Sequence, residues 1–332
     1  MGWLHMMRLK APVLVAIALL AGACGLSPSS SSSNSAALMS FSVDSTDLGM
    51  QAFVAANEGM FAKHNINPVI RVFTYGVDGV DAMLTGQVNA GFACDFASLI
   101  RAGTGHIKIL ATTATGVGPF SKLIVRSGIN AGSDLSGKTL GTALGTATQF
   151  TWLKYLQSVG VAQSSVHFVN FSSAFEMVAA MKAGRIDGAF LWGPAIAQGL
   201  QIPGTKVLIG DDKIPGAATI CLMVVDSQFL SQHRDTVNRA VAALVDASNF
   251  IKSNQDQAAQ DLATGIGAKK QDALDYYSSN AFPMELTKEQ VQHLSDVAAF
   301  QLQNGILKQP LDINSVVDAG PLRAAAPSNV TV

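Results

Sequence analysis

Residues 83–92 read MLTGQVNAGF, and 98 positions later residues 181–190 read MKAGRIDGAF. Each stretch indicates the end of a helix, a glycine that stops the helix, and a short apolar strand. The same offset relates residues 69–75 to residues 167–173, which both indicate a strand that leads into a helix. Two copies of one β-α-β-α-β pattern predict two similar α/β lobes within one chain.

The segments between and after the two copies predict how the lobes are joined. A Thr- and Gly-rich stretch at 113–119 indicates a crossing to the second lobe, residues 214–218 indicate the return, and an apolar strand at 219–225 re-enters the first lobe. Residues 50–64 show helical spacing, and everything after residue 231 reads as helical. We therefore expect an α/β fold with a two-strand hinge and a helical C-terminal extension. The expected lobes are lobe 1, residues 38–116 plus 215–332, and lobe 2, residues 117–214.

The N-terminal segment is typical of a targeting signal. Arg8 and Lys10 precede an apolar run at 11–23 that is too short to be a permanent membrane span, which predicts a signal peptide over residues 1–23. The stretch LLAGAC at 19–24 resembles a bacterial lipobox, in which the cysteine is lipidated, although Ala21 stands where lipoboxes usually have Leu. We expect an exported protein anchored through Cys24 to the outer face of the cytoplasmic membrane. Ordinary cleavage and release is the alternative.

The residues that follow the lipobox indicate a flexible tether. The expected tether spans residues 24–37, and its low-complexity part, SPSSSSSNS at 27–35, contains nothing that a folded core could bury. As a flexible coil, residues 27–35 reach about 20 Å from end to end. A tether of this length behind a lipidated cysteine would hold a folded domain close to a membrane surface.

Composition and motifs exclude several classes of function. The chain has 22 Lys and Arg against 23 Asp and Glu, so it lacks the basic surplus that binding to nucleic acid requires. The three cysteines form no CxxC pattern, which argues against zinc and iron–sulfur sites. Residues 132–139 match the phosphate-loop pattern GxxxxGK[ST], but they run into a strand rather than a helix N-terminus. We expect no metal and no cofactor.

Three further segments, in this order, carry a resemblance to a known family: NEGMFAKHNI at 57–66, TGQVNAG at 85–91 and DLSGKTLG at 134–141. They resemble the substrate-binding proteins of bacterial ABC importers for nitrate, sulfonate and taurine, a family that includes binders of thiamine-pyrimidine precursors. The resemblance covers roughly residues 40–251. It implies a periplasmic-binding-protein-like fold, a small-molecule ligand in the interlobe cleft, permease and ATPase partners, and a monomer.

Two other functions are weighed against this one. The fungal pyrimidine synthases of thiamine biosynthesis resemble the same fold and carry a cofactor-binding lysine and a donor histidine after the third strand. At the matching places this chain has Ala93 and Ala97, and its returning strand offers Cys221 alone. We therefore predict that the protein is not an enzyme. A regulatory sensor domain on the same fold is the third reading.

Candidate ligand-binding residues follow from the predicted strand ends. In open α/β sheets, ligands bind at the carboxyl ends of the strands, and helix N-termini that follow these strands favour an anionic group. The sequence GTAT at 145–148 resembles the family's Gly-Ser/Thr-rich loop, and Tyr75 and Trp192 offer surfaces for stacking. The candidates are Ser45, Thr46, Asp47, Gln51, Tyr75, Gly76, Asp78, Cys94, Asp95, Thr113, Thr146, Ala147, Thr148, Phe171, Ser172 and Trp192.

Several of these residues have a structural alternative. Asp78 and Asp95 are equally suited to cap the helices that they begin. In the resembled fold the returning strand lies beside the third strand, so Cys94 and Cys221 are either two buried thiols or a disulfide. The candidate loops hold no Lys or Arg, yet they include Asp47 along with Asp78 and Asp95. This composition favours a zwitterion of the taurine kind, or a pyrimidine, over nitrate.

Overall fold

The computed structural model of the chain describes residues 35–46, 48–103, 106–277 and 280–332. The predicted signal peptide, the predicted lipidation residue Cys24, most of the predicted tether and the candidate residue Asp47 lie outside the described residues. In the part of the chain that is described, no helix is long and apolar enough to cross a membrane. Residues Ala36–Val332 form one compact unit, which contains both lobes.

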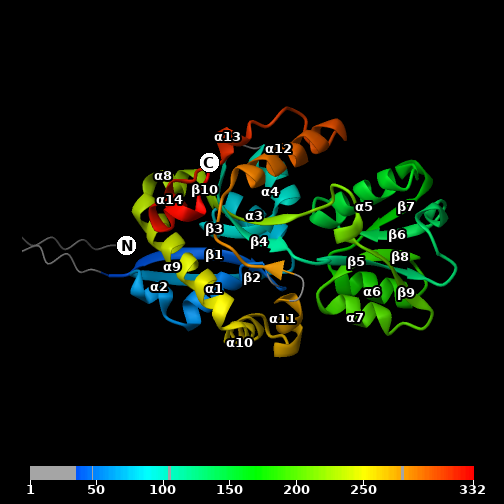
Figure 1. Cartoon of the computed structure of the whole chain (residues 1–332), viewed down its shortest axis with the longest axis horizontal. Helices are drawn as coiled ribbons and strands as arrows, with labels where there is room; N and C mark the ends of the chain where they lie inside the picture. Colours follow the sequence, from blue (N-terminus) through cyan, green and yellow to red (C-terminus); the bar gives the residue numbers. More distant parts are fainter. Residues whose placement is uncertain (1–34, 47, 104–105, 278–279) are drawn as a thin grey trace, which may run out of the picture. The chain divides into compact units, whose positions relative to one another are not determined.

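Lobe 1 is built on a mixed sheet (Figure 1). Within the described residues this sheet has six strands in the order β11-β4-β10-β3-β1-β2. β1 pairs in parallel with β2 and β3, whereas β10 is antiparallel to both β3 and β4. The strands are β1 Ala37–Asp44, β2 Ile66–Phe73, β3 Ala90–Cys94, β4 Ile107–Gly116, β10 Ile220–Asp226 and β11 Asn280–Ala281.

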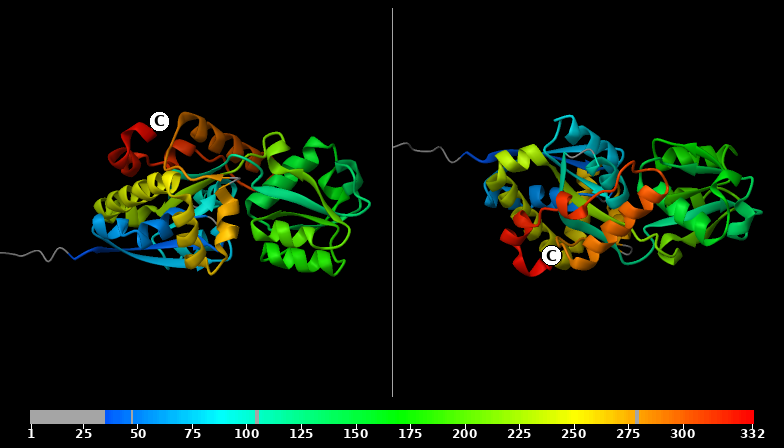
Figure 2. Two further views of the ribbon diagram at one scale, coloured as in Figure 1. Left: turned by 60° about the horizontal axis from the view of Figure 1, so that its bottom comes forward. Right: turned by 90° about the horizontal axis from the view of Figure 1, so that it is seen from above.

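Helices cover both faces of this sheet (Figures 1 and 2). On one face, Phe41, Phe92 and Met223 pack with α1, α9 and α10, and on the other Leu222 and Val224 pack with α3, α4 and α12. The helices of lobe 1 are α1 Met50–Asn57, α2 Met60–Lys63, α3 Gly76–Leu84, α4 Asp95–Ala102, α8 Ser227–Gln232, α9 Arg234–Ser253, α10 Gln255–Ile266, α11 Lys270–Tyr277, α12 Lys288–Gln303, α13 Ile313–Val316 and α14 Gly320–Ala325.

Lobe 2 repeats this plan on a smaller scale. Its sheet has, within the described residues, five strands in the order β7-β6-β8-β5-β9. Trp152 and Tyr155 of α5 cover one face, and Met177 and Met181 of α6 cover the other. The elements are β5 Ser121–Arg126, β6 Thr139–Thr142, α5 Ala147–Ser158, β7 His167–Asn170, α6 Ala174–Lys182, β8 Gly188–Trp192, α7 Pro194–Leu200 and β9 Thr205–Gly210.

The predicted repeat is confirmed by the elements themselves. α3 and α6, β3 and β8, and β4 and β9 each begin 98 residues apart. Gly86 and Gly184, which end the two equivalent helices, have φ of 75° and 73°, a left-handed conformation that glycine adopts without strain. The predicted architecture of two similar α/β lobes is therefore confirmed.

Three local predictions differ from the structure. The single helix expected over residues 50–64 is divided into α1 and α2, because Gly59 between them has a φ of 71°. The chain after residue 231 is not wholly helical, since β11 adds a strand to the edge of the lobe 1 sheet beside β4. The helical reading of this segment also fails at residues 317–319, because α13 ends at Val316 and α14 begins only at Gly320.

The lobes are joined by packing as well as by the two chain crossings, which lie between β4 and β5 and between β9 and β10. Phe150 and Leu153 of the lobe 2 helix α5 are buried in a hydrophobic cluster whose other members belong to lobe 1. The ring of Phe150 is stacked 5.4 Å from that of Phe96 and lies edge-on 5.3 Å from that of Phe300. Side chains of one lobe thus complete the core of the other.

Candidate functional site

A small cavity lies where the strand ends of the two lobes meet. Its volume is ≈ 50 Å³, well below the range of roughly 300–1,000 Å³ that is usual for ligand pockets. At this volume the cavity cannot hold an organic solute, so binding of such a ligand requires it to widen. The lining residues are Asp44, Leu48, Tyr75, Gly76, Val77, Cys94, Ala97, Phe120, Thr146, Ala147, Thr148 and Trp192.

An aromatic wall, formed by Tyr75 of lobe 1 and Trp192 of lobe 2, closes one side of this cavity. The two ring centroids are 5.8 Å apart, and the hydroxyl of Tyr75 donates a hydrogen bond of 3.4 Å to the carbonyl of Phe171. Burial, together with the charges of Glu176 and Asp78, raises the pKa of Tyr75 above its ordinary value. Tyr75 therefore remains a neutral phenol that contacts lobe 2.

The N-terminus of α5 faces the cavity from lobe 2. Thr146 caps this helix, because its hydroxyl oxygen accepts a hydrogen bond of 3.2 Å from the amide of Thr148. Gly145, with a φ of 77°, forms the turn from β6 into the helix. Free amides at the start of a helix, with the positive end of its dipole, favour an anionic group. This end of the cavity can therefore hold a negatively charged ligand atom.

A guanidinium lies close to the same turn. A Cβ placed on Gly145 would be 3.4 Å from Nη1 of Arg101, a residue of the lobe 1 helix α4. Arg101 also forms an ion pair with Asp81, in which Nε and Nη2 lie 2.9 and 3.0 Å from the two carboxylate oxygens. Sequence reasoning missed Arg101 because it is separated from the turn by more than forty residues of chain.

Asp44, the last residue of β1, is the one charged residue among the described residues that line the cavity. It is 5 % exposed, and its carboxylate accepts hydrogen bonds of 2.9 and 3.0 Å from the amides of Thr46 and Leu48 and of 2.8 Å from the hydroxyl of Thr46. The rule that ligands bind at strand ends points to the segment 44–47, but the candidate list begins at Ser45 and omits Asp44.

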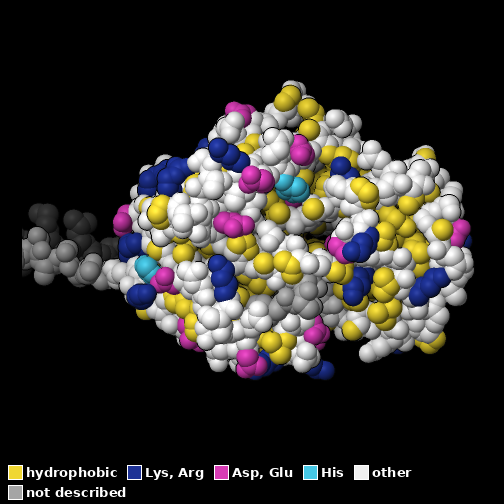
Figure 3. Space-filling model, in the orientation of Figure 1, with side chains coloured by type: hydrophobic (Ala, Val, Ile, Leu, Met, Phe, Trp, Pro, Cys, Tyr) yellow, Lys and Arg dark blue, Asp and Glu magenta, His cyan; other side chains and the backbone are white. Residues whose placement is uncertain are grey.

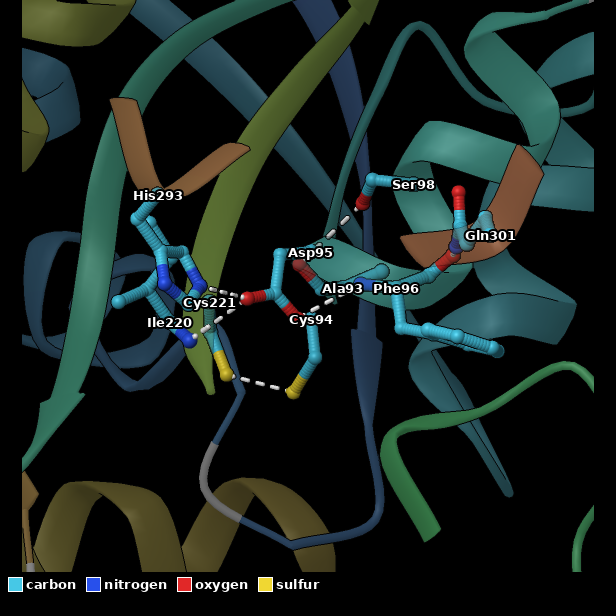
Figure 4. Close-up of polar contacts among 9 residues, drawn as sticks. All are labelled: Ala93, Cys94, Asp95, Phe96, Ser98, Ile220, Cys221, His293 and Gln301. Carbon is cyan, nitrogen blue, oxygen red and sulfur yellow. Dashed lines mark hydrogen bonds and ion pairs between the residues drawn. The ribbon is translucent and has the colours of Figure 1, made fainter. Parts of the chain in front are cut away.

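Two predicted carboxylates, those of Asp78 and Asp95, form hydrogen bonds within the protein and do not line the cavity. Asp95 is fully buried, and its oxygens accept hydrogen bonds from the amides of Phe96 at 2.6 Å and Ile220 at 3.2 Å. Nε2 of His293 lies 2.5 Å from the same carboxylate (Figure 4). Asp78 is exposed and accepts the amide of Tyr75 at 3.2 Å. Both residues therefore organise helix starts, and neither lines the cavity.

The pKa of His293, the residue that contacts Asp95, is shifted by its surroundings. Burial alone lowers the pKa of His293, but the hydrogen bond and the negative charge of Asp95 more than offset that effect, with a further contribution from Asp296. The pKa of His293 is therefore raised above its ordinary value. The imidazole joins the C-terminal helix α12 to the start of α4, next to the cavity residue Cys94.

The other predicted residues divide into those around the cavity and those that hold its loops. Seven candidates line it: Tyr75, Gly76, Cys94, Thr146, Ala147, Thr148 and Trp192. Gln51 is fully buried, and its amide nitrogen donates to the carbonyls of Thr113 and Pro283 at 2.7 and 3.2 Å. Loop contacts inside the protein also involve Ser45, Thr46, Phe171 and Ser172.

Three further observations concern other kinds of ligand: the charges on one face, the phosphate-loop-like segment and the grouping of possible metal ligands. Basic and acidic side chains are mixed over the face shown in Figure 3. The GxxxxGK[ST] match forms a short 3₁₀ turn, Gly132–Leu135, and then leads into β6, so no helix N-terminus follows it. In the described part of the chain, no three His, Cys, Asp or Glu side chains are grouped so that they could hold a metal ion.

Comparisons with known proteins agree with this arrangement. The family model "NMT1/THI5 like" matches residues 49–258. The taurine-binding periplasmic protein of Escherichia coli strain K12 is 29% identical over 209 residues, which are 62% of this chain and 64% of that protein. A protein of Brucella abortus strain 2308 that is named a "putative binding protein" is 25% identical over 271 residues, which are 78% of this chain and 83% of that protein.

Solved structures show the same fold at low sequence identity. The alkanesulfonate-binding protein SsuA of Xanthomonas axonopodis pv. citri, bound to MOPS, has a TM-score of 0.72 and 14% identity, covering 85% of this chain and 98% of that one. The desulfurization enzyme DSZB has a TM-score of 0.66 and 17% identity, covering 88% and 99%. The fold is therefore shared by binding proteins and by at least one enzyme.

The two lobes, the hinge and the cavity between the strand ends define a solute-binding protein of the periplasmic-binding-protein fold. Within this class the chain belongs to the NMT1/THI5-like family, whose model matches more than half of its length. The family resemblance predicted from the sequence is thereby confirmed.

Proposed function

We propose that this chain is an exported, lipid-anchored binding protein that captures a small organic sulfonate, of the taurine kind, and delivers it to an ABC importer. The observation that carries the proposal is the convergence, on one interlobe cavity, of a capped helix N-terminus, a buried carboxylate and an aromatic wall. The names of the taurine-binding and alkanesulfonate-binding relatives support the ligand class. The lipobox-like stretch around Cys24 supports the anchor.

The two ends of the cavity suit the two ends of an amino-sulfonate. A sulfonate would accept hydrogen bonds from the amides at the start of α5, where the helix dipole favours an anion. An ammonium group would be attracted by the carboxylate of Asp44 on the lobe 1 side. A preference of the cavity for a zwitterionic ligand therefore depends on Asp44, because Asp78 and Asp95 do not line the cavity.

Closure of the lobes would follow from a ligand that touches both of these ends. An interaction shifts the open and closed populations only when it is stronger in one of the two states. Contacts with Thr146 and Asp44 at the same time are available only when the lobes are together. The ligand would therefore stabilise the closed form, which is the form that a permease can distinguish from the empty protein.

A pyrimidine of the thiamine-precursor kind is the second candidate. The aromatic wall of Tyr75 and Trp192 favours it, because a flat ring stacks on such surfaces. We propose binding without catalysis. The taurine-binding periplasmic protein of Escherichia coli is a binding protein by name, and this sequence has Ala93 and Ala97 at the places that match the lysine and histidine of the fungal synthases.

Isothermal titration calorimetry with taurine, an alkanesulfonate without an amine, nitrate and an aminopyrimidine would separate these ligands. We expect taurine to bind and nitrate not to bind. The variant Asp44→Asn should weaken taurine at least several-fold and leave the amine-free sulfonate nearly unchanged, whereas Phe175→Ala, an exposed lobe 2 substitution, should change neither. Binding of the aminopyrimidine alone would replace the sulfonate proposal with the second candidate.

A further inference from the structure

Two cysteines face each other beneath the ligand cavity. Cys94 ends β3 and Cys221 lies near the start of β10, and the two residues are direct partners in the antiparallel pairing of these strands. Their sulfur atoms are 2.7 Å apart (Figure 4). A disulfide bond is about 2.05 Å long, so a shift of well under 1 Å would bring the sulfurs to bonding distance.

The backbone on both sides of this pair is held by one carboxylate. Asp95, the residue after Cys94, accepts a hydrogen bond of 3.2 Å from the amide of Ile220, the residue before Cys221. The same carboxylate contacts His293, which anchors it to α12. The strand that returns from lobe 2 is therefore fixed against β3 beside both sulfur atoms, which removes much of the freedom that would otherwise oppose their joining.

Both thiols are buried within lobe 1. Cys94 is 7 % exposed and Cys221 is 4 % exposed, and they share one hydrophobic cluster. Cys94 also lines the ligand cavity, so the pair is reached from the cleft side. The short distance between the sulfur atoms, their direct strand pairing and an exported location, where disulfides persist, all favour formation of a disulfide.

We propose that Cys94 and Cys221 are joined by an intramolecular disulfide in the exported protein. The thiolate of Cys94 attacks a small-molecule or protein disulfide, and one thiol leaves. The thiolate of Cys221 then attacks the sulfur of Cys94 in the mixed disulfide, and the second thiol leaves. Two protein thiols and one external disulfide give one protein disulfide and two external thiols, with each protein proton passing to a departing thiolate.

The bond would close a loop of chain that contains the whole of lobe 2. Every element from β5 to β9 lies between Cys94 and Cys221 in the sequence. The disulfide would therefore fix the point at which the returning strand enters lobe 1, while the other crossing, between β4 and β5, stays unbridged. Lobe 2 would then move relative to a covalently fixed strand.

The disulfide rests on the proposed export, but alkylation of the exported protein tests it without any ligand, so its failure is distinguishable from a failure of the proposed ligand. The protein is isolated without reductant, denatured in N-ethylmaleimide, digested and analysed by mass spectrometry for the peptides that contain Cys94 and Cys221. We expect neither peptide to carry the label before reduction and both to carry it after reduction. Full labelling of both peptides before reduction would overturn the proposal.

Thermal unfolding of single variants provides the matching control. In Cys221→Ala the remaining Cys94 should be labelled without reduction, and a reductant should not shift the melting temperature. In the wild-type protein the same reductant should lower the melting temperature by several degrees. If the reductant left the melting temperature of the wild-type protein unchanged, the result would contradict a disulfide between these strands.

Discussion

Replacement of Phe150 by alanine is expected to loosen the contact between the two lobes. Phe150 belongs to α5 of lobe 2, is 1 % exposed, and packs between Phe96 and Phe300 of lobe 1. Truncating a fully buried phenylalanine destabilises a protein by about 3–5 kcal/mol. At roughly 2–4 °C per kcal/mol for a chain of this size, the melting temperature should fall by on the order of 10 °C.

The same substitution should weaken ligand binding, because α5 also carries Thr146 at the cavity. Burial of a phenylalanine side chain is worth about 1.5–3 kcal/mol. If all of that free energy favours the ligand-binding arrangement, its loss reduces the apparent affinity by about ten- to a hundredfold. Differential scanning calorimetry and ligand titration would measure the two effects on the same preparation.

A matched control is available on the same lobe. Phe175 of α6 is 47% exposed, so Phe175→Ala removes an equal side chain that is not packed between the lobes. We expect its free energy of unfolding to stay within about 0.5 kcal/mol of the wild-type value. If Phe150→Ala behaved like Phe175→Ala in both assays, the reasoning that Phe150 joins the lobes would be refuted.

Three other substitutions test the cavity and the buried histidine. Trp192→Ala should reduce the affinity measured by calorimetry by about ten- to a hundredfold, since it removes half of the aromatic wall; unchanged affinity would place the ligand elsewhere. Asp95→Asn should lower the free energy of unfolding by about 1–3 kcal/mol with little change in affinity, because Asp95 bonds within the protein; a selective loss of binding would reverse that assignment. The raised pKa of His293 stabilises the fold most below about pH 6.5, the unfolded value, and this contribution is lost as pH rises through the folded value. Urea unfolding should therefore show a stability difference between wild type and His293→Gln that shrinks with rising pH, and a difference that grew with pH would contradict the sign.

Much of the fold could be predicted because the sequence repeats a pattern whose period is visible. The pairing of residues 83–92 with 181–190 located two equivalent helix ends and strands, and both glycines adopt the left-handed conformation there. The break between α1 and α2 was missed because Gly59 interrupts an apolar pattern that otherwise continues. β11 was missed because a strand of two residues has no period to detect.

Part of the cavity lining could be predicted because residues at the carboxyl ends of neighbouring strands lie close together. This rule located Tyr75, Thr146 and Trp192. It could not separate a carboxylate that lines the cavity from one that forms hydrogen bonds within the protein, as Asp95 shows. The partner of Asp95 is His293, 198 residues further along the chain, and no local pattern connects the two.

The strand order of the two sheets has a consequence for the order in which the lobes can form. All the strands described in the lobe 2 sheet lie in one continuous stretch, from Ser121 to Gly210. The lobe 1 sheet instead needs β10 between β3 and β4, and the residues of β10 come after the whole of lobe 2. During refolding, lobe 2 can therefore complete its sheet from sequence-local contacts, whereas lobe 1 must first close a loop of more than a hundred residues, which slows its formation.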